Sequence, residues 1–237
     1  MYNWSASPIG RLAISAGRWQ VCTVFEWESL VNRPSYHLIL ASKSPRRREL
    51  LAEAGYDFTV VPADEEVESG AAFSLGPVEL VRELAYRKAA DVVSRLRSGG
   101  LSETPEFAAG GRPTVVLGCD TVVECDGAIL GKPTDRDDAR RMLERLRGRT
   151  HQVHSGLCLW PLSAESLTVD VATTTLRMDR LDADRIDEYL AGDGWEGKAG
   201  AFGYQDRTGW VHVVAGSESN VVGLPLELLA DMLAKLG

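Results

Sequence analysis

The residues best suited to take part in chemistry form a run of hydroxyls and cations after a short apolar segment. Residues 37–41 (HLILA) fit a buried strand, and Ser42-Lys43-Ser44-Pro45-Arg46-Arg47 follows directly. Pro45 suits the first turn of a helix, with Ser44 as its N-cap. A helix N-terminus with hydroxyl and guanidinium donors beside it suits a polyphosphate. A capped helix with solvated basic side chains remains the alternative for this run taken alone.

A carboxylate and a lysine farther along the chain could act on the same ligand. Asp120 follows the apolar run 114–118 (TVVLG), and α/β folds place ligand chemistry at the carboxyl end of central strands. Such a carboxylate could bind Mg2+ or take a proton from water. Lys132 follows an Asp126-Gly127 turn signal and could be aimed at a phosphate. Taken separately, each also fits a plain turn residue.

Two further segments could complete a site. Glu66, in the acidic stretch 63–66, could be a second carboxylate on a metal ion, although alone it fits an acidic loop. The stretch 197–205 is rich in small residues, which let the backbone approach a ligand closely. Gln205 at its end could donate to and accept from the edge of a nucleobase. A flexible loop is the alternative interpretation of this stretch.

Composition and charge limit the class of protein. The chain has 237 residues, 44% of them hydrophobic, which is enough to bury a sizeable core. Its apolar runs are too short to cross a bilayer, and its first residues lack the apolar segment of a secretion signal. We therefore expect a cytoplasmic protein without a membrane partner. A formal net charge of −8 disfavours nucleic acid as a partner but permits a small anionic ligand.

The pattern around these residues predicts strands and helices that alternate from about residue 37. Strands are expected at 37–41, 58–61, 114–118 with an extended continuation to 125, 153–160, 167–178 and 210–214. Helices are expected at 45–54, 77–96, from a capping box at 134–137 to about 147, at 182–191 and at 224–236. This order indicates an α/β fold, with a mixed sheet and helices on its faces.

Two segments stand apart from this pattern. Residues 1–36 hold three of the six tryptophans and have no strong helical period. We interpret them as an N-terminal extension of unknown role, followed by one domain at 37–237. The stretch 98–113 is rich in glycine, proline and serine and predicts a surface loop or insertion.

Several separate motifs, in this order, resemble those of the Maf family of nucleotide pyrophosphatases. The motifs are Leu40-Ala41-Ser42-x-Ser44-Pro45-Arg46-Arg47, Glu65-Glu66, Arg87-Lys88, Gly118-x-Asp120-Thr121, Gly131-Lys132-Pro133, Lys198-Ala199-Gly200-Ala201 and Val222-Gly223-Leu224-Pro225. The resemblance implies an elongated mixed β-sheet flanked by helices, like that of inosine triphosphate pyrophosphatases, and a possible homodimer. It also implies hydrolysis of dTTP or UTP to the monophosphate and pyrophosphate, with Mg2+ or Mn2+ as cofactor.

The same resemblance implies roles for single residues. Asp120 corresponds to the proton acceptor and, together with Glu66, to the metal-side carboxylates. The residues that correspond to the phosphate site are Ser42, Arg46, Lys88 and Lys132, of which the two lysines are also expected to serve catalysis. The residues at positions that select the base in the branch acting on dTTP and UTP are Arg47, Thr121 and Gln205.

Two other functions stay open at this point. Position 131 is glycine where the dTTP/UTP branch commonly has glutamate, and Gly-Lys-Pro is more like the branch acting on 7-methyl-GTP. A pyrophosphatase for a modified nucleotide is therefore the alternative enzyme. The family name is linked to septum inhibition, so a non-catalytic, nucleotide-binding regulator of septum formation is the alternative of another class. Retained carboxylates favour catalysis, with a role in nucleotide-pool sanitation or cell-division arrest.

Overall fold

The chain divides into two compact units, Met1–Ser35 and Tyr36–Gly237. A computed structural model describes residues 36–68, 75–99, 112–206 and 208–236, together with two short strands, β1 (Leu12–Ser15) and β2 (Arg18–Val21). In the first unit, β1 and β2 form an antiparallel pair. The loop expected at 98–113 lies almost wholly outside the described residues.

The second unit is built on a seven-stranded sheet in the order β4-β3-β5-β7-β8-β9, with β6 paired to β5. Its strands are β3 (His37–Leu40), β4 (Phe58–Val60), β5 (Thr114–Cys125), β6 (Ala128–Leu130), β7 (Thr150–Pro161), β8 (Thr168–Met178) and β9 (Val211–Ala215). β3 runs parallel to both β4 and β5, whereas the ladders from β5 through β7 and β8 to β9 are antiparallel. The predicted mixed sheet is confirmed.

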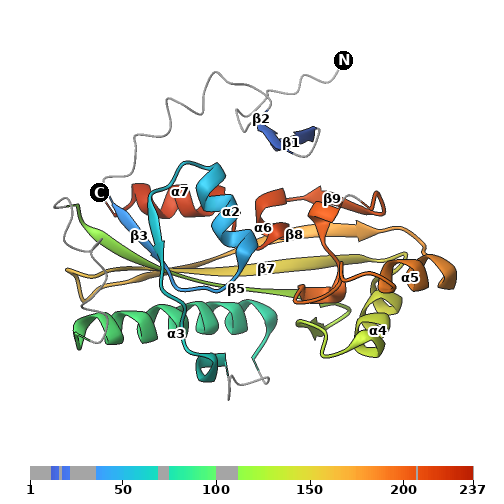
Figure 1. The fold of residues 1–237 in the computed structure, drawn as a ribbon, viewed down its shortest axis with the longest axis horizontal. Helices are drawn as coiled ribbons and strands as arrows, with labels where there is room; N and C mark the ends of the chain where they lie inside the picture. Colours follow the sequence, from blue (N-terminus) through green and yellow to red (C-terminus); the bar gives the residue numbers. More distant parts are fainter. Residues whose placement is uncertain are drawn as a thin grey trace. The chain divides into compact units, whose positions relative to one another are not determined.

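Helices cover both faces of this sheet, as Figure 1 shows. α3 (Pro77–Arg97) runs along one face, while α2 (Pro45–Glu53), α6 (Glu218–Val222) and α7 (Leu226–Ala234) lie on the other. α4 (Arg136–Leu146) and α5 (Ala183–Leu190) pack together near one end of the sheet. Short 3-10 turns occur at η1 (Glu65–Glu68), η3 (Ala199–Ala201) and η4 (Tyr204–Asp206). Among the described helices, none combines the length and apolarity needed to span a bilayer.

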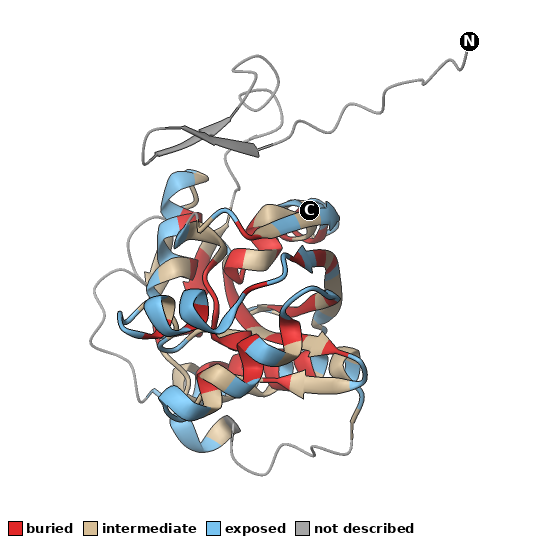
Figure 2. Cartoon of the chain, turned by 90° about the vertical axis from the view of Figure 1, so that its right-hand side faces the viewer, coloured by how far each residue is buried: buried red, intermediate tan, exposed pale blue. Residues whose placement is uncertain are grey.

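The buried residues, red in Figure 2, lie mainly in the sheet and on the helix faces that pack against it. On the α3 face, Ala85 and Ala89 pack with Ile39, Val116 and Cys158. A larger cluster between the sheet, α4 and α5 contains the buried aromatic side chains of Phe202 and Trp210. These two clusters fix the helices against the strands that carry the predicted site.

Two predicted helix boundaries are wrong. α4 begins one residue later than the capping box at 134–137 suggests, because Asp135 is the N-cap and its side chain accepts from the N–H of Asp138. The helix expected at 224–236 is α7, which begins two residues later, at Leu226, and the short helix α6 before it was not expected. Gly223, with φ of 118°, ends α6 in the left-handed region, which favours glycine.

Two glycines let α3 pack unusually close to the sheet. A Cβ added to Gly118 on β5 would lie 2.1 Å from the carbonyl oxygen of Ala85, and one added to Gly156 on β7 would lie 2.2 Å from that of Val81. Because backbone meets backbone at both points, even alanine would push the helix away from the strands. This close approach sets the position of Lys88, one turn beyond Ala85 on α3.

Candidate active site

The site begins where β3 ends. β3 pairs with β5 up to the register Leu40↔Leu117, and β6 pairs with β5 only from Val123. On this side, within the described part of the chain, residues 118–122 of β5 have no strand neighbour. A cavity of about 660 Å³ is lined there by Asp120 and Thr121. The expectation that Asp120 follows the end of a strand is therefore wrong, because β5 continues to Cys125 and its neighbour stops instead.

Eight of the nine residues singled out from the sequence line this cavity: Ser42, Arg46, Arg47, Lys88, Asp120, Thr121, Lys132 and Gln205. They come from segments far apart in the sequence, which the sheet and its loops bring together. The ninth, Glu66, is exposed in η1 and is not among the lining residues. Its neighbours Asp64 and Glu65 line the cavity instead.

The charge of the cavity wall differs from that of the chain. The full sequence carries a formal net charge of −8. The cationic side chains that line the cavity are Lys43, Arg46, Arg47, Lys88, Lys132 and Lys198, and the carboxylates are Asp64, Glu65, Asp120 and Glu196. The wall thus has more cations than carboxylates. Such a local excess attracts a polyanion even in an acidic protein.

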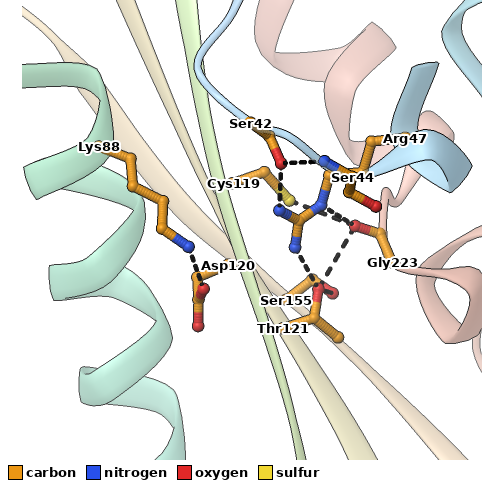
Figure 3. A network of polar contacts seen from close by, with 9 residues as sticks. All are labelled: Ser42, Ser44, Arg47, Lys88, Cys119, Asp120, Thr121, Ser155 and Gly223. Atoms are coloured by element: carbon orange, nitrogen blue, oxygen red, sulfur yellow. Dashed lines mark hydrogen bonds and ion pairs between the residues drawn. The ribbon is translucent and has the colours of Figure 1, made fainter. Parts of the chain in front are cut away.

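On the α3 face of β5, Asp120 forms an ion pair with Lys88. The Nζ of Lys88 lies 2.5 Å from Oδ1 of Asp120, and both side chains are largely buried, at 9% and 13% exposed. Gly118 lies two residues before Asp120 on the same face of the strand, because side chains alternate along a strand. The close packing at Gly118 therefore brings Lys88 within reach of the carboxylate. Figure 3 shows this pair on one side of β5.

On the opposite face of β5, Arg47 is buried in a cage of neutral acceptors. Its Nε donates to the carbonyl of Gly223 at 2.8 Å, its Nη1 to Ser42 Oγ at 2.9 Å and its Nη2 to Thr121 Oγ1 at 3.1 Å. Thr121 Oγ1 also lies 2.8 Å from Ser155 Oγ. Arg47 as a whole is only 8% exposed. This network, drawn in Figure 3, fixes the Arg47 plane against the cavity wall.

The basic run at the start of α2 reaches several walls of the cavity. Pro45 is at the first position of α2 as predicted, and Ser44 is at the N-cap, but the Ser44 side chain makes no capping bond. Arg46 Nη2 donates to the carbonyl of Gly197 at 3.0 Å, and burial lowers the pKa of its guanidinium. Lys43 reaches the other way and pairs with Glu65 at 2.8 Å. The loop thus bridges two sides of the cavity.

Sequence reasoning assigned no role to two side chains of this site. Ser155 lies on β7 beside Thr121, and nothing local in its strand indicates a polar network. Lys198 lies within a motif that the family resemblance includes, but no spacing in the sequence indicates a charge partner for it. In the structure Lys198 lines the cavity and forms an ion pair with Asp206, with Nζ to Oδ2 at 2.5 Å.

The carboxylates of the cavity suit a hard divalent cation that also binds substrate oxygens. Among the described residues, no group of three or more histidine, cysteine or acidic side chains is placed to hold a metal by itself. Mg2+ commonly uses one or two carboxylates and completes its shell with water and phosphate oxygens. Asp120, with Asp64 or Glu65, offers that donor set in the cavity wall. The residues therefore fit such a cation together with a polyphosphate.

Comparison with known proteins places the chain in a family. Residues 37–236 match the family described as Maf-like protein. A protein of Rhodopirellula baltica named dTTP/UTP pyrophosphatase is 49% identical over 197 residues, which cover 83% of this chain and 80% of that protein. One of Ruminiclostridium cellulolyticum with the same name is 36% identical over 202 residues, covering 84% and 96%. The solved structure of the Staphylococcus aureus Ham1 protein matches with a TM-score of 0.43 and 14% identity, over 85% of this chain and 100% of that one. With a family match that spans nearly the whole second unit, this chain belongs to the Maf family.

Proposed function

We propose that this protein hydrolyses dTTP and UTP to the nucleoside monophosphate and pyrophosphate. The observation that carries the proposal is the buried Lys88–Asp120 pair inside a cavity whose wall is rich in lysine and arginine. The relatives named dTTP/UTP pyrophosphatase support the same reaction. The proposal assigns the α–β phosphoanhydride as the bond that breaks.

The chemistry of this reaction needs what the cavity wall offers. Hydrolysis of a phosphoanhydride is limited by charge repulsion and by the alignment of water. In the proposed step, Asp120 accepts a proton from water while the water oxygen bonds to the α-phosphorus. The bond from the α-phosphorus to the bridging oxygen breaks, and pyrophosphate leaves. Lys88 holds the Asp120 carboxylate in place, while Ser42, Arg46 and Lys132 bind phosphate oxygens.

The proposal includes a divalent cation, Mg2+ or Mn2+. Bound beside Asp120, it would neutralise phosphate charge and orient the substrate. Glu66 stays the second carboxylate that the family resemblance implies, whereas Asp64 and Glu65 are supported by their place in the cavity wall. Cation titrations of Asp64→Asn, Glu65→Gln and Glu66→Gln separate these candidates. Substitution of the residue that binds the cation should raise the cation concentration needed for half-maximal activity by about tenfold.

For base selection, we propose the face of β5 that carries Thr121. Arg47, Thr121 and Gln205 all line the cavity, and two of them are hydrogen-bonded to each other. Uracil and thymine present carbonyl acceptors where cytosine presents an amino donor, so a fixed guanidinium favours the former. Gly131, which resembles the 7-methyl-GTP branch, lies in the β6–α4 loop and is not among the residues that line the cavity.

The names of the curated relatives favour dTTP and UTP over 7-methyl-GTP. A regulator that only senses nucleotides is the less favoured function, because binding alone gives no reason to bury a carboxylate next to a lysine. A pyrophosphate-release assay with dTTP, UTP, CTP and 7-methyl-GTP separates the three functions. We expect turnover of dTTP and UTP above the other two. Turnover of 7-methyl-GTP alone would assign the other branch, and no turnover of any of them would support the regulator.

The wider setting of this activity is also part of the proposal. We place the enzyme in the cytoplasm, with a role in nucleotide-pool sanitation or division arrest, and we propose that it forms a homodimer. Residues 37–237 form the catalytic domain, and residues 1–36 are an extension that catalysis does not need. Light scattering of the purified protein would test the dimer, and fractionation of the source cells would test the compartment.

A further inference from the structure

We propose that Lys198 is a further phosphate-binding residue of this site and that Asp206 positions it. The inference rests on the proposed function, because it adds a contact to the same substrate. It goes beyond the roles assigned so far, none of which includes Lys198 or Asp206. Both side chains belong to the segment between α5 and β9.

A small polar network around Asp206 holds the Lys198 side chain in place. Its side chain is 12% exposed and lines the cavity, whereas Asp206, 25% exposed, is not among the lining residues. The Asp206 carboxylate also accepts from the hydroxyl of Tyr189 at 3.2 Å, and that hydroxyl lies 2.8 Å from the carbonyl of Gly194. Burial raises the pKa of Tyr189 and favours the protonated hydroxyl, whose single proton is shared between these two oxygens. The network fixes the carboxylate, and the carboxylate fixes Nζ.

Gly203 leaves the room that this ion pair occupies. A Cβ added there would lie 2.3 Å from Oδ2 of Asp206 and 2.4 Å from Nζ of Lys198. Both distances are far below a van der Waals contact, so any side chain would displace the pair. The φ of Gly203 is not positive, so backbone conformation does not require glycine there. Space for the charged pair is therefore the reason for glycine at this position.

The backbone on either side of Lys198 is hydrogen-bonded to two other segments that carry cations, the start of α2 and the loop before α4. Arg46 donates to the carbonyl of Gly197, directly before Lys198. Gly200 N–H donates to the carbonyl of Gly131 at 3.0 Å, directly before Lys132. These two bonds bring the chain around Lys198 beside the segments of Arg46 and Lys132. Three cations from three separate segments of the chain therefore line one cavity.

The turn after Lys198 stores backbone strain. Ala201 has φ of 61° and is fully buried, although left-handed backbone is unfavourable for a residue with a Cβ. Such strain persists only where the surrounding structure fixes it, and it concentrates at ligand sites. Here it accompanies the bond from Gly200 to Gly131, which joins the two lysine loops.

The chemistry of the pair suits a phosphate. An ammonium has three N–H donors, and Asp206 takes one of them, so donors remain for an anion on the cavity side. A carboxylate placed behind the lysine restricts its four-carbon side chain, and therefore less conformational entropy is lost when phosphate binds. The competing explanation is a purely structural ion pair that closes the loop onto α5.

Binding of inorganic pyrophosphate with Mg2+, measured by calorimetry, separates these explanations without requiring turnover. We expect Lys198→Met to weaken pyrophosphate binding by about tenfold or more, because a charge-assisted contact is lost. Lys198→Arg keeps the charge and should lose no more than about threefold. Arg149→Met removes the ion pair with Asp126 on the β5–β6 turn, outside the cavity, and should leave binding unchanged. Unchanged binding in folded Lys198→Met protein would overturn the proposal.

The role of Asp206 is tested by measuring both pyrophosphate affinity and thermal stability in its variants. Asp206→Ala should weaken pyrophosphate binding by about threefold to tenfold and raise KM for UTP, and Asp206→Glu should recover part of both. A structural pair would lower the melting temperature in both lysine and aspartate variants and leave affinity intact. If wild-type protein binds pyrophosphate but hydrolyses no nucleotide, the proposed function fails while this inference stands. If wild-type protein turns over UTP and Lys198→Met does so equally well, only this inference fails.

Discussion

The two faces of β5 between residues 118 and 123 carry opposite kinds of polar structure. On the α3 face, which we call the charged face, Asp120 and Lys88 form an ion pair. On the other face, which we call the neutral face after its uncharged acceptors, Arg47 is surrounded by the oxygens of Ser42, Thr121 and Gly223. The first arrangement suits proton transfer, which needs a charged group at the reacting atom. The second suits recognition, which needs fixed donors that do not change protonation. Under the proposed function, one strand would separate the two tasks by the alternation of its side chains.

The largest effect should come from the charged face. Asp120→Asn keeps the shape of the side chain but cannot accept a proton, so we expect kcat with UTP to fall by about 10²–10⁴-fold. Asp126→Asn, at the turn where β5 ends, is the matched control and should keep wild-type turnover. Thermal unfolding of both variants checks that the fold is intact. Wild-type rates in Asp120→Asn would show that the two faces do not divide the work in this way.

The neutral face should respond in affinity and selectivity more than in rate. Arg47→Lys leaves acceptors without their donor, because an ammonium cannot reproduce the guanidinium fork. We expect kcat/KM for dTTP and UTP to fall by about 10–100-fold, mainly through KM, with less discrimination against CTP. Arg48→Lys, on the exposed side of α2, is the control. A loss confined to kcat, with selectivity unchanged, would assign Arg47 to the chemistry instead.

The spacing between α3 and β5 should affect only the charged face. Gly118→Ala would place a Cβ 2.1 Å from the Ala85 carbonyl and push α3, with Lys88, away from Asp120. We expect about tenfold lower kcat and about 1–3 kcal/mol lower stability. Gly192→Ala, where a Cβ would meet its nearest atom at 3.9 Å, should change neither. Selectivity between UTP and CTP should stay constant, and a change there would contradict the separation of the faces.

A buried histidine, His151, should limit the stability of the protein at acid pH. Burial lowers the pKa of His151 to about 4, and its ring packs edge-on against Phe202, which lines the cavity. The unfolded chain therefore binds a proton near pH 6.5 before the folded protein does. As pH falls from about 6.5 to about 4, the free energy of unfolding should drop by up to about 3 kcal/mol. Urea unfolding of wild type and His151→Leu at pH 7.5 and 4.5 measures this, and equal losses in both would exclude His151 as the cause.

The smallest effect should come from outside both faces. All residues of the two networks lie within the unit Tyr36–Gly237. Deletion of residues 1–35 should therefore change kcat/KM for UTP by less than about twofold, since no proposed contact is lost. Activity and solubility of the truncated protein measure this. Loss of soluble, active protein on truncation would mean that the first unit supports the site.

Local sequence pattern predicted the individual strands and helices, including the helix that starts at Pro45 and the Asp126-Gly127 hairpin, because these depend on neighbouring residues, and the order of the elements then indicated a mixed sheet. It could not predict the Lys88–Asp120 pair, since the two residues are 32 positions apart and meet through a glycine contact between backbone atoms. The resemblance to a family, rather than any spacing, identified Lys88. Glu66 shows a second limit of sequence pattern. An acidic stretch does not reveal which of its carboxylates faces a cavity, and here Asp64 and Glu65 line it whereas Glu66 does not.

The early end of β3 has a consequence for how this scaffold can diversify. The opening beside β5 is made by main-chain pairing, with β3 on one side of it and β6 on the other. Side chains on the Thr121 face of this opening can change without breaking the main-chain hydrogen bonds that hold the sheet together, whereas Gly118 on the α3 face is fixed by its contact with the backbone of α3. Under the proposed function, new preferences for nucleobases could therefore accumulate on the Thr121 face while Asp120 and Lys88 stay in place for hydrolysis.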